Sequence, residues 1–108
     1  MVLENFIRRF NTITKEKPVL LIIDDIQWAD SGTLALIHYL SRTIRSMRIV
    51  ALMTYSTEAI MTGENKIFVD TVRNISIERN AKTLELKPFN MDQVVHLLTK
   101  IIGTWNPD

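Results

Sequence analysis

The sequence has no cysteine among its 108 residues, so neither a disulfide framework nor a thiolate-rich zinc site is possible. The charge is balanced: 13 basic and 12 acidic side chains leave a net charge of +1, which demands neither a nucleic acid nor an anionic membrane as partner. No apolar run approaches the ~18 residues that would cross a bilayer, and the first residues lack the order of a secretory signal. These absences predict a soluble, cytoplasmic domain with no membrane association.

Glycine is also scarce, with 3 residues in the chain, and this excludes one motif. A phosphate-binding P-loop needs two glycines that flank four residues and are followed by Lys and then Ser or Thr, because its backbone N–H groups must approach the phosphates closely. Lys follows none of Gly32, Gly63 and Gly103. The sequence therefore contains no P-loop.

Four segments carry apolar side chains at the three- and four-residue spacing of an amphipathic helix. They are residues 2–14, residues 66–78, a segment capped by Asp30 or Ser31, and a segment that begins after Asn90. The last has the clearest local signals, because Asn90 and Gln93 have the spacing of a capping box and Gly103 follows the apolar stripe. Residues 58–65, just before the helix at 66–78, are predicted to form a loop around Gly63.

Three apolar segments predict strands, at 19–23, 49–55 and 84–86. The first two are unalternating runs rich in Val, Ile and Leu, which suit strands covered on both faces, as in a parallel sheet. Helices of ten or more residues between strands imply right-handed crossovers. We therefore expect an α/β fold with three layers, in which helices flank a partial parallel sheet of about three strands.

Polar side chains follow the first two predicted strands, at the edge where open parallel sheets bind their ligands. Asp24 and Asp25 follow the first strand, and Thr54 and Ser56 follow the second. Adjacent carboxylates repel each other, and a hydrated Mg²⁺ ion is the most economical reason for such a pair, because it takes one or two carboxylates and completes its shell with water and phosphate oxygens. The structural alternative is that both acids cap loops. The nearby aromatic residue Trp28 is expected to pack under the next helix.

Residues 19–30, VLLIIDDIQWAD, resemble the extended Walker B segment of STAND-type signalling ATPases. These ATPases are a branch of the AAA-like P-loop NTPases and include the ATP-dependent large LuxR-type transcription regulators. Their pattern begins with an apolar strand, two acids and one apolar residue. The next position is usually His and is followed by Trp-Ala-Asp and a Leu-rich helix. Gln27 stands here in place of His. The likeness extends over residues 18–102, through the sensor strand at 49–56 to the last core strand and the start of the helical lid.

The resemblance implies a role for each polar residue at the strand ends. Asp24 would hold Mg²⁺, through water, and Asp25 would polarise the water that attacks ATP. Thr54 and Ser56 would lie in the sensor region, where many relatives have Arg at the position of Ser56. The resemblance also implies a partial P-loop NTPase core over residues 1–89 and the start of a helical lid over residues 90–108.

Because the P-loop is missing, the resemblance implies only the Walker B half of an ATPase core. In that family the P-loop follows a strand that lies between the strands matching 49–55 and 83–87. We therefore expect ATP and Mg²⁺ to bind in an intact parent protein, where the P-loop strand, the lid and an output domain are partners of this segment. We expect the chain alone to hold no resident cofactor, to bind ATP weakly or not at all, and to be inactive, with a response to a divalent ion confined to Asp24 and Asp25. Unpaired strand edges would promote self-association, or the strand at 83–87 would pair directly with the strand at 49–55.

Two other classes of function match part of the pattern. Receiver domains of two-component signalling also have an acid pair after an early strand, Thr or Ser after a later one and Lys-Pro after the last, as Asp24, Asp25, Thr54 and Lys87-Pro88 do here. The phosphoacceptor is missing, because the only acid between Asp25 and Thr54 is Asp30 and no strand fits before it. The other alternative is a non-catalytic α/β module that binds another chain through its apolar strand edges.

Overall fold

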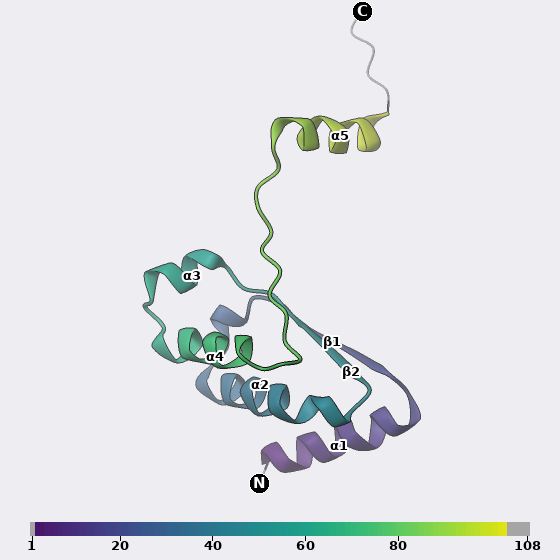
Figure 1. Cartoon of the computed structure of the whole chain (residues 1–108), viewed down its shortest axis with the longest axis vertical. Coiled ribbons are helices and arrows are strands. Elements are labelled where there is room, and N and C mark those ends of the chain that lie inside the picture. The colour runs from purple at the N-terminus through teal and green to yellow at the C-terminus, as the bar shows by residue number, and fades with distance from the viewer. Residues whose placement is uncertain (1, 104–108) are drawn as a thin grey trace, which may run out of the picture.

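The computed structural model describes residues 2–103, which form five α-helices, two strands and two short 3-10 helices (Figure 1). In chain order these are α1 (Val2–Glu16), β1 (Val19–Ile23), η1 (Ile26–Trp28), α2 (Ser31–Thr43), η2 (Ile44–Ser46), β2 (Ile49–Met53), α3 (Thr57–Thr62), α4 (Lys66–Ser76) and α5 (Met91–Ile102). The helices expected at 2–14, after Asp30, at 66–78 and after Asn90 are confirmed. The expected loop at 58–65 is wrong over its first part, because α3 forms there and ends at Gly63, whose φ of 64° suits a helix terminus.

The two strands pair in parallel, in a register that runs from Val19 opposite Ile49 to Ile23 opposite Met53. The α2 helix makes the crossover between them, so the α/β class is confirmed. The expected third strand is wrong: within residues 2–103 the sheet has two strands, and residues 84–86 form neither helix nor strand. Three residues can form only a few ladder hydrogen bonds, and residues 84–86 lie in an exposed segment that pairs with neither strand of the sheet.

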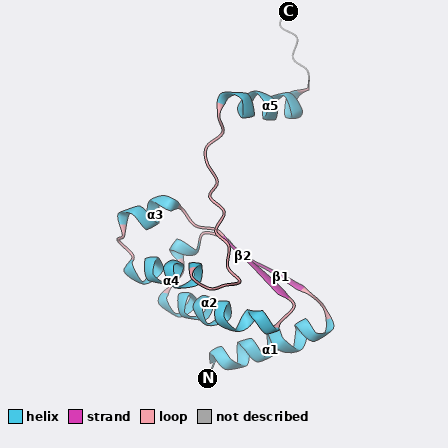
Figure 2. Cartoon of the chain, viewed as in Figure 1, coloured by secondary structure: helices cyan, strands magenta, loops and turns pink. Residues whose placement is uncertain are grey.

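Only one face of this sheet is covered (Figure 2). Ile23 and Met53 point to the covered face and pack against the core, whereas the alternate side chains are exposed. The exposed set is Leu20, Ile22, Val50 and Leu52. The expectation of strands covered on both faces in a three-layer fold is therefore wrong for the described residues, because no helix among them packs over that exposed face.

The core lies between the covered face of the sheet and the helices α2 and α4. Phe68 of α4 is fully buried, and Leu34 and Ile37 of α2 pack with it. Tyr55, just after β2, meets the Phe68 ring edge-to-face with 5.9 Å between the ring centroids. This small core fixes the carboxyl ends of both strands, where the candidate site lies.

The α5 helix stands apart from this body at the end of an extended linker, residues 82–90 (Figure 1). All residues from 82 to 103 are exposed, so α5 forms without tertiary packing. Its capping box explains this independence: Asn90 accepts a hydrogen bond from the Gln93 N–H and Gln93 accepts one from the Asn90 N–H, each at 2.9 Å. Of the expected lid at 90–108, residues 104–108 lie outside the described residues.

Candidate functional site

The carboxyl ends of β1 and β2 bring three of the four predicted site residues together: Asp24, Asp25 and Thr54. Hydrogen bonds between the two segments continue past the end of the sheet, where the Thr54 N–H donates to the Ile23 carbonyl at 3.1 Å and the Ile26 N–H donates to the Thr54 carbonyl at 2.9 Å. These two bonds hold the segment that follows β1 against the segment that follows β2. All three site side chains are exposed, so they can reach a ligand.

The Thr54 hydroxyl contacts both acids. It donates a hydrogen bond to the Asp24 carboxylate and accepts one from the Asp25 N–H at 2.9 Å. A hydroxyl has one donor and can accept as well, so both bonds can exist together. Thr54 therefore orients the Asp24 carboxylate and fixes the backbone at Asp25.

Asp25 has a left-handed backbone, with φ 55° and ψ 53°, and is the only non-glycine residue with positive φ among residues 2–103. Aspartate tolerates this conformation better than most residues because its short polar side chain can form local hydrogen bonds. The conformation turns the chain out of β1 and into η1. Strained positions of this kind gather at functional sites, which makes Asp25 a functional candidate on structural grounds as well.

The fourth predicted residue, Ser56, does not join this group. It precedes α3 and makes no capping hydrogen bond through its side chain. Instead it lines a cavity of about 360 Å³ between η1 and the segment from α3 to the start of α4. The cavity is lined by Gln27, Trp28, Ser56, Glu58, Ala59, Thr62, Glu64, Asn65 and Phe68. The predicted site residues therefore fall into two places: Asp24, Asp25 and Thr54 lie at the strand ends, and Ser56 lines the cavity.

Two residues of this cavity were missed or misplaced by sequence reasoning. The Gln27 Oε1 atom is buried and has no hydrogen-bond partner, an unfavourable arrangement for an acceptor. Trp28 is 83% exposed, so the expectation that it packs under the next helix is wrong. The η1 turn places Ile26 in the core instead, and the two following residues face the cavity. The only signal in the sequence was the position of Gln27 and Trp28, two and three residues after Asp25.

Asp30 has a structural role, as expected from the sequence. Its carboxylate accepts a hydrogen bond of 2.7 Å from the Thr33 N–H and caps α2. Hydrogen bonds from the Thr33 side chain and backbone hold the pKa of Asp30 below its ordinary value of 3.8. Asp30 is thus occupied at the helix terminus and is not a third ligand for an ion near Asp24.

The oxygen atoms of Asp24 and Asp25 fit one kind of metal ion. Among residues 2–103 no group of three or more His, Cys, Asp or Glu side chains could hold a metal, which argues against an all-protein cage there. A hydrated Mg²⁺ ion needs fewer protein ligands, because it keeps several waters and binds through one or two carboxylates. The donors at the strand ends fit such an ion.

Comparisons with known proteins do not place the chain in a family: no family model matches it, and neither curated proteins nor solved structures give a match. In the part of the chain from residue 2 to residue 103, no helix is both long and apolar enough to cross a membrane.

Proposed function

We propose that this chain is the Walker B segment of a signalling ATPase of the STAND or AAA-like class. In this proposal it contributes the Mg²⁺ and water positions of the ATP site to a longer parent protein and is not catalytic alone. The observation that carries the proposal is the hydrogen bond from the Thr54 hydroxyl to the Asp24 carboxylate. It joins an acid after one parallel strand to a hydroxyl after its neighbour, at the edge where such sheets bind ligands.

The residues at the strand ends have distinct roles in this proposal. Asp24, held in one orientation by Thr54, binds Mg²⁺ through water, and the ion supplies positive charge that stabilises the phosphate oxygens of ATP. Asp25 lies one residue further out on a turned backbone, where its carboxylate orients a water molecule and accepts a proton from it. Ser56 lines the adjacent cavity, which includes neither acid, and is assigned a sensor role only.

The phosphate cradle must come from elsewhere in the parent protein, because the sequence has no P-loop. The free edge of β2 is the place where a further parallel strand can add, since β1 occupies its other edge. In this proposal the P-loop strand pairs there, and its loop then lies next to Thr54, at the same edge of the sheet as Asp24 and Asp25.

The test uses the parent protein that carries this sequence together with a P-loop. We expect Asp24→Asn to weaken Mg²⁺-dependent ATP binding and to slow hydrolysis, because the ion loses its carboxylate. We expect Asp25→Asn to retain ATP binding while single-turnover hydrolysis falls by about 10²–10⁴-fold, the usual contribution of a general base. Asp30→Asn is the matched control, because asparagine caps helices as well as aspartate does.

Two results would contradict the proposal. If Asp25→Asn hydrolyses ATP at the parental rate, Asp25 has no catalytic role. If Asp24→Asn binds Mg-ATP as tightly as the parent protein, the acid pair is structural. A calorimetric titration of the 108-residue chain with Mg-ATP tests separately whether the P-loop is needed for binding. A micromolar dissociation constant for this chain would refute the proposal that it contributes only the Walker B part of an ATP site.

A second candidate function, a non-catalytic interaction module, is favoured by the exposed apolar face of the sheet. A titration of the isotope-labelled chain with Mn²⁺, followed by NMR, distinguishes the two candidates. Residual affinity of the acid pair for a divalent ion predicts paramagnetic broadening that starts at the amides of Asp24, Asp25 and Thr54. An interaction module predicts no selective broadening at these three residues.

A further inference from the structure

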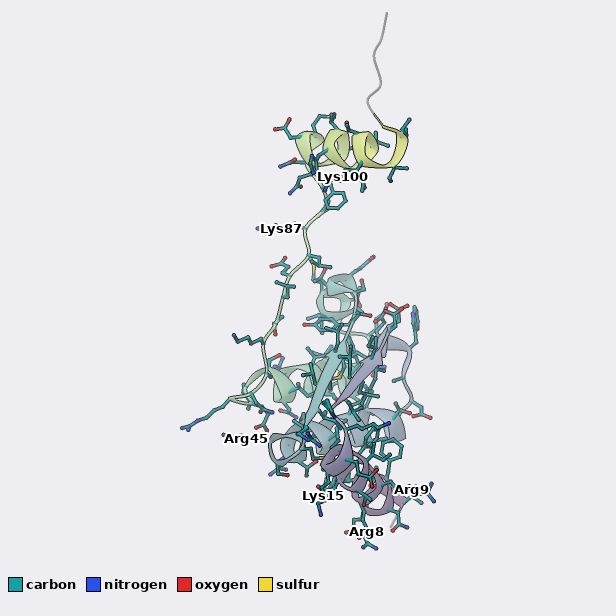
Figure 3. The ribbon with its side chains drawn as sticks, turned by 90° about the vertical axis from the view of Figure 1, so that its right-hand side faces the viewer. Arg8, Arg9, Lys15, Arg45, Lys87 and Lys100 are labelled. Atoms are coloured by element: carbon teal, nitrogen blue, oxygen red, sulfur yellow. The ribbon has the colours of Figure 1, made fainter. Side chains whose placement is uncertain are left out.

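Two apolar surfaces of this chain lack a cover among the described residues. The first is the bare sheet face, made of Leu20 and Ile22 on β1 and Val50 and Leu52 on β2, each between 53% and 65% exposed. In the register of the sheet, Leu20 lies opposite Val50 and Ile22 opposite Leu52, so the four side chains form one continuous patch. Figure 3 shows the strands from the side on which no helix crosses them.

The second surface is the α5 stripe, the apolar side of α5. Its members recur at helical spacing and are between 37% and 76% exposed: Met91, Val94, Val95, Leu98, Ile101 and Ile102. An amphipathic helix normally packs this side against another element. Here no residue of α5 is buried.

The two surfaces match in size. A strand of five residues is about 16 Å long and its neighbour lies about 5 Å away. A helix of twelve residues is about 18 Å long and about 10 Å wide with its side chains. One helix laid along the strands therefore covers both strands over their whole length.

The linker decides which copy of α5 reaches the bare sheet face. Residues 82–90 pass the carboxyl ends of the strands and continue away from the body, with Lys87 on the stretched part (Figures 1 and 3). Covering its own sheet would require the chain to reverse its direction in this linker. An extended arm that projects a packing-competent helix away from its own domain is the geometry of domain exchange.

We propose that two copies of this chain form a symmetric dimer in which the α5 stripe of each copy covers the bare sheet face of the other. Each chain has one donor surface and one acceptor surface, so reciprocal exchange closes the pair and leaves neither surface exposed. Direct packing of two sheet faces would leave both α5 stripes in water. The dimer does not depend on the ATPase proposal, because it involves neither Asp24 nor Asp25.

Cross-linking tests the exchange directly, because the chain has no cysteine of its own. Two single-cysteine variants are mixed at a concentration at which the chain is dimeric: Ile22→Cys, on the bare sheet face, and Leu98→Cys, on the α5 stripe. Under mild oxidation we expect a disulfide between the two different chains, seen as a dimer on a non-reducing gel. The control pairs Leu98→Cys with Ser76→Cys, an exposed position on α4 outside the proposed contact.

Three outcomes of this experiment would overturn the proposal. One is a cross-link no stronger than that of the Ser76→Cys control. Another is an Ile22→Cys chain that pairs with itself as efficiently as with Leu98→Cys, because this indicates packing of sheet on sheet. The third is an intrachain disulfide in the double variant Ile22→Cys/Leu98→Cys at every concentration, since this shows that α5 covers its own sheet.

Light scattering after size exclusion provides a second, charge-based test. We expect Leu52→Glu and Leu98→Lys, each alone, to raise the dissociation constant of the dimer by about tenfold or more, as for other changes at the centre of an interface. Mixing them restores a dimer, because one contact is then unmodified and the other pairs opposite charges. Leu98→Lys lies outside the folded body, so loss of folding does not explain its effect. A wild-type chain that stays monomeric at all concentrations, or a mixture that fails to recover, refutes the exchange.

Discussion

Thr54 is the side chain that joins the ends of the two strands. Its hydroxyl donates to Asp24 and accepts from the backbone of Asp25, so one residue sets the orientation of one acid and the backbone position of the other. Both contacts require the Thr54 side chain. The orientation of the Asp24 carboxylate therefore depends on this hydroxyl group, while backbone hydrogen bonds between Ile23, Ile26 and Thr54 hold the two segments together.

Replacing Thr54 by valine tests this dependence. Thr54→Val keeps the shape of the side chain but removes the hydroxyl, and we expect the free energy of unfolding to fall by about 1 kcal/mol, the usual net value of a lost hydrogen bond. Thr54→Ser is the control and keeps most of the stability, because its hydroxyl can make both contacts. Urea unfolding at pH 7 measures both variants. Equal stability of Thr54→Val and the wild type would show that the bridge does not stabilise the fold.

Asp30 gives the chain a pH-dependent helix cap. Hydrogen bonds from Thr33 lower the pKa of Asp30 in the folded state, so its ionised form stabilises the fold above the unfolded value of 3.8, and this contribution is lost as the pH falls through the folded pKa. We expect the wild type to lose more stability between pH 7 and pH 3 than Asp30→Asn, whose cap does not titrate. Urea unfolding at the two pH values measures the difference. Identical losses in the two proteins would contradict the role of the Asp30 carboxylate.

At the scale of elements, the chain combines a small core with helices and strands that are only partly covered. The strands alternate between half-buried and exposed side chains, and the segment at 84–86 lies in the exposed linker. A two-stranded sheet is marginal without packing against a helix, so α2 and α4 provide the stability of β1 and β2. The exposed segment at 84–86 contributes nothing to that core.

A pair of leucine variants tests this difference. Leu34 is 1% exposed in the core and Leu84 is 84% exposed in the linker. We expect Leu34→Ala to lower the free energy of unfolding by about 2–5 kcal/mol, because it leaves a cavity in the core. A loss of this size is enough to unfold a domain of low stability. We expect Leu84→Ala to change it by less than about 0.5 kcal/mol. A large loss for Leu84→Ala would show that residues 84–86 do pack as a strand.

The whole molecule is elongated, with extents of 67 × 39 × 23 Å and a radius of gyration of 18.6 Å. A compact chain of about 100 residues has a radius of gyration of about 13 Å, so the difference reflects the distance of α5 from the body. The linker has no regular structure and is exposed over its whole length. Because α5 lies away from the body, both the α5 stripe and the bare sheet face are left exposed.

Limited proteolysis tests the shape of the chain. Trypsin cuts exposed, extended segments first, and the linker contains Lys82 and Lys87. We expect the first cut after Lys82, because Pro88 protects the bond that follows Lys87, and mass spectrometry identifies the two products. Lys66 and Arg73 lie within the first and last turns of α4 and serve as internal controls. An initial cut within α4, with the linker intact, would contradict the extended linker.

Local signals were sufficient to predict much of the chain from its sequence. The caps formed by Asp30 and by Asn90 with Gln93 depend on residues three positions apart, so each is set by its own short segment. The convergence of Asp24, Asp25 and Thr54 was also predictable, because parallel strands end at a common edge. Apolar periodicity predicted four of the five helices among the described residues, and continuous apolar runs predicted both strands.

Only the tertiary structure decided what covers these elements. An apolar run such as residues 19–23 indicates a strand, but whether one or both of its faces are covered depends on helices that are distant in the sequence. Residues 84–86 have a strand composition yet find no neighbour, and a strand forms only where a partner completes its hydrogen bonds. Trp28 and Ser56 line the cavity because η1 and the segment at the start of α3 border it from two sides. Short-range patterns favour helices and strands, whereas long-range contacts, which no short pattern encodes, decide whether a strand finds a partner and which surfaces are buried.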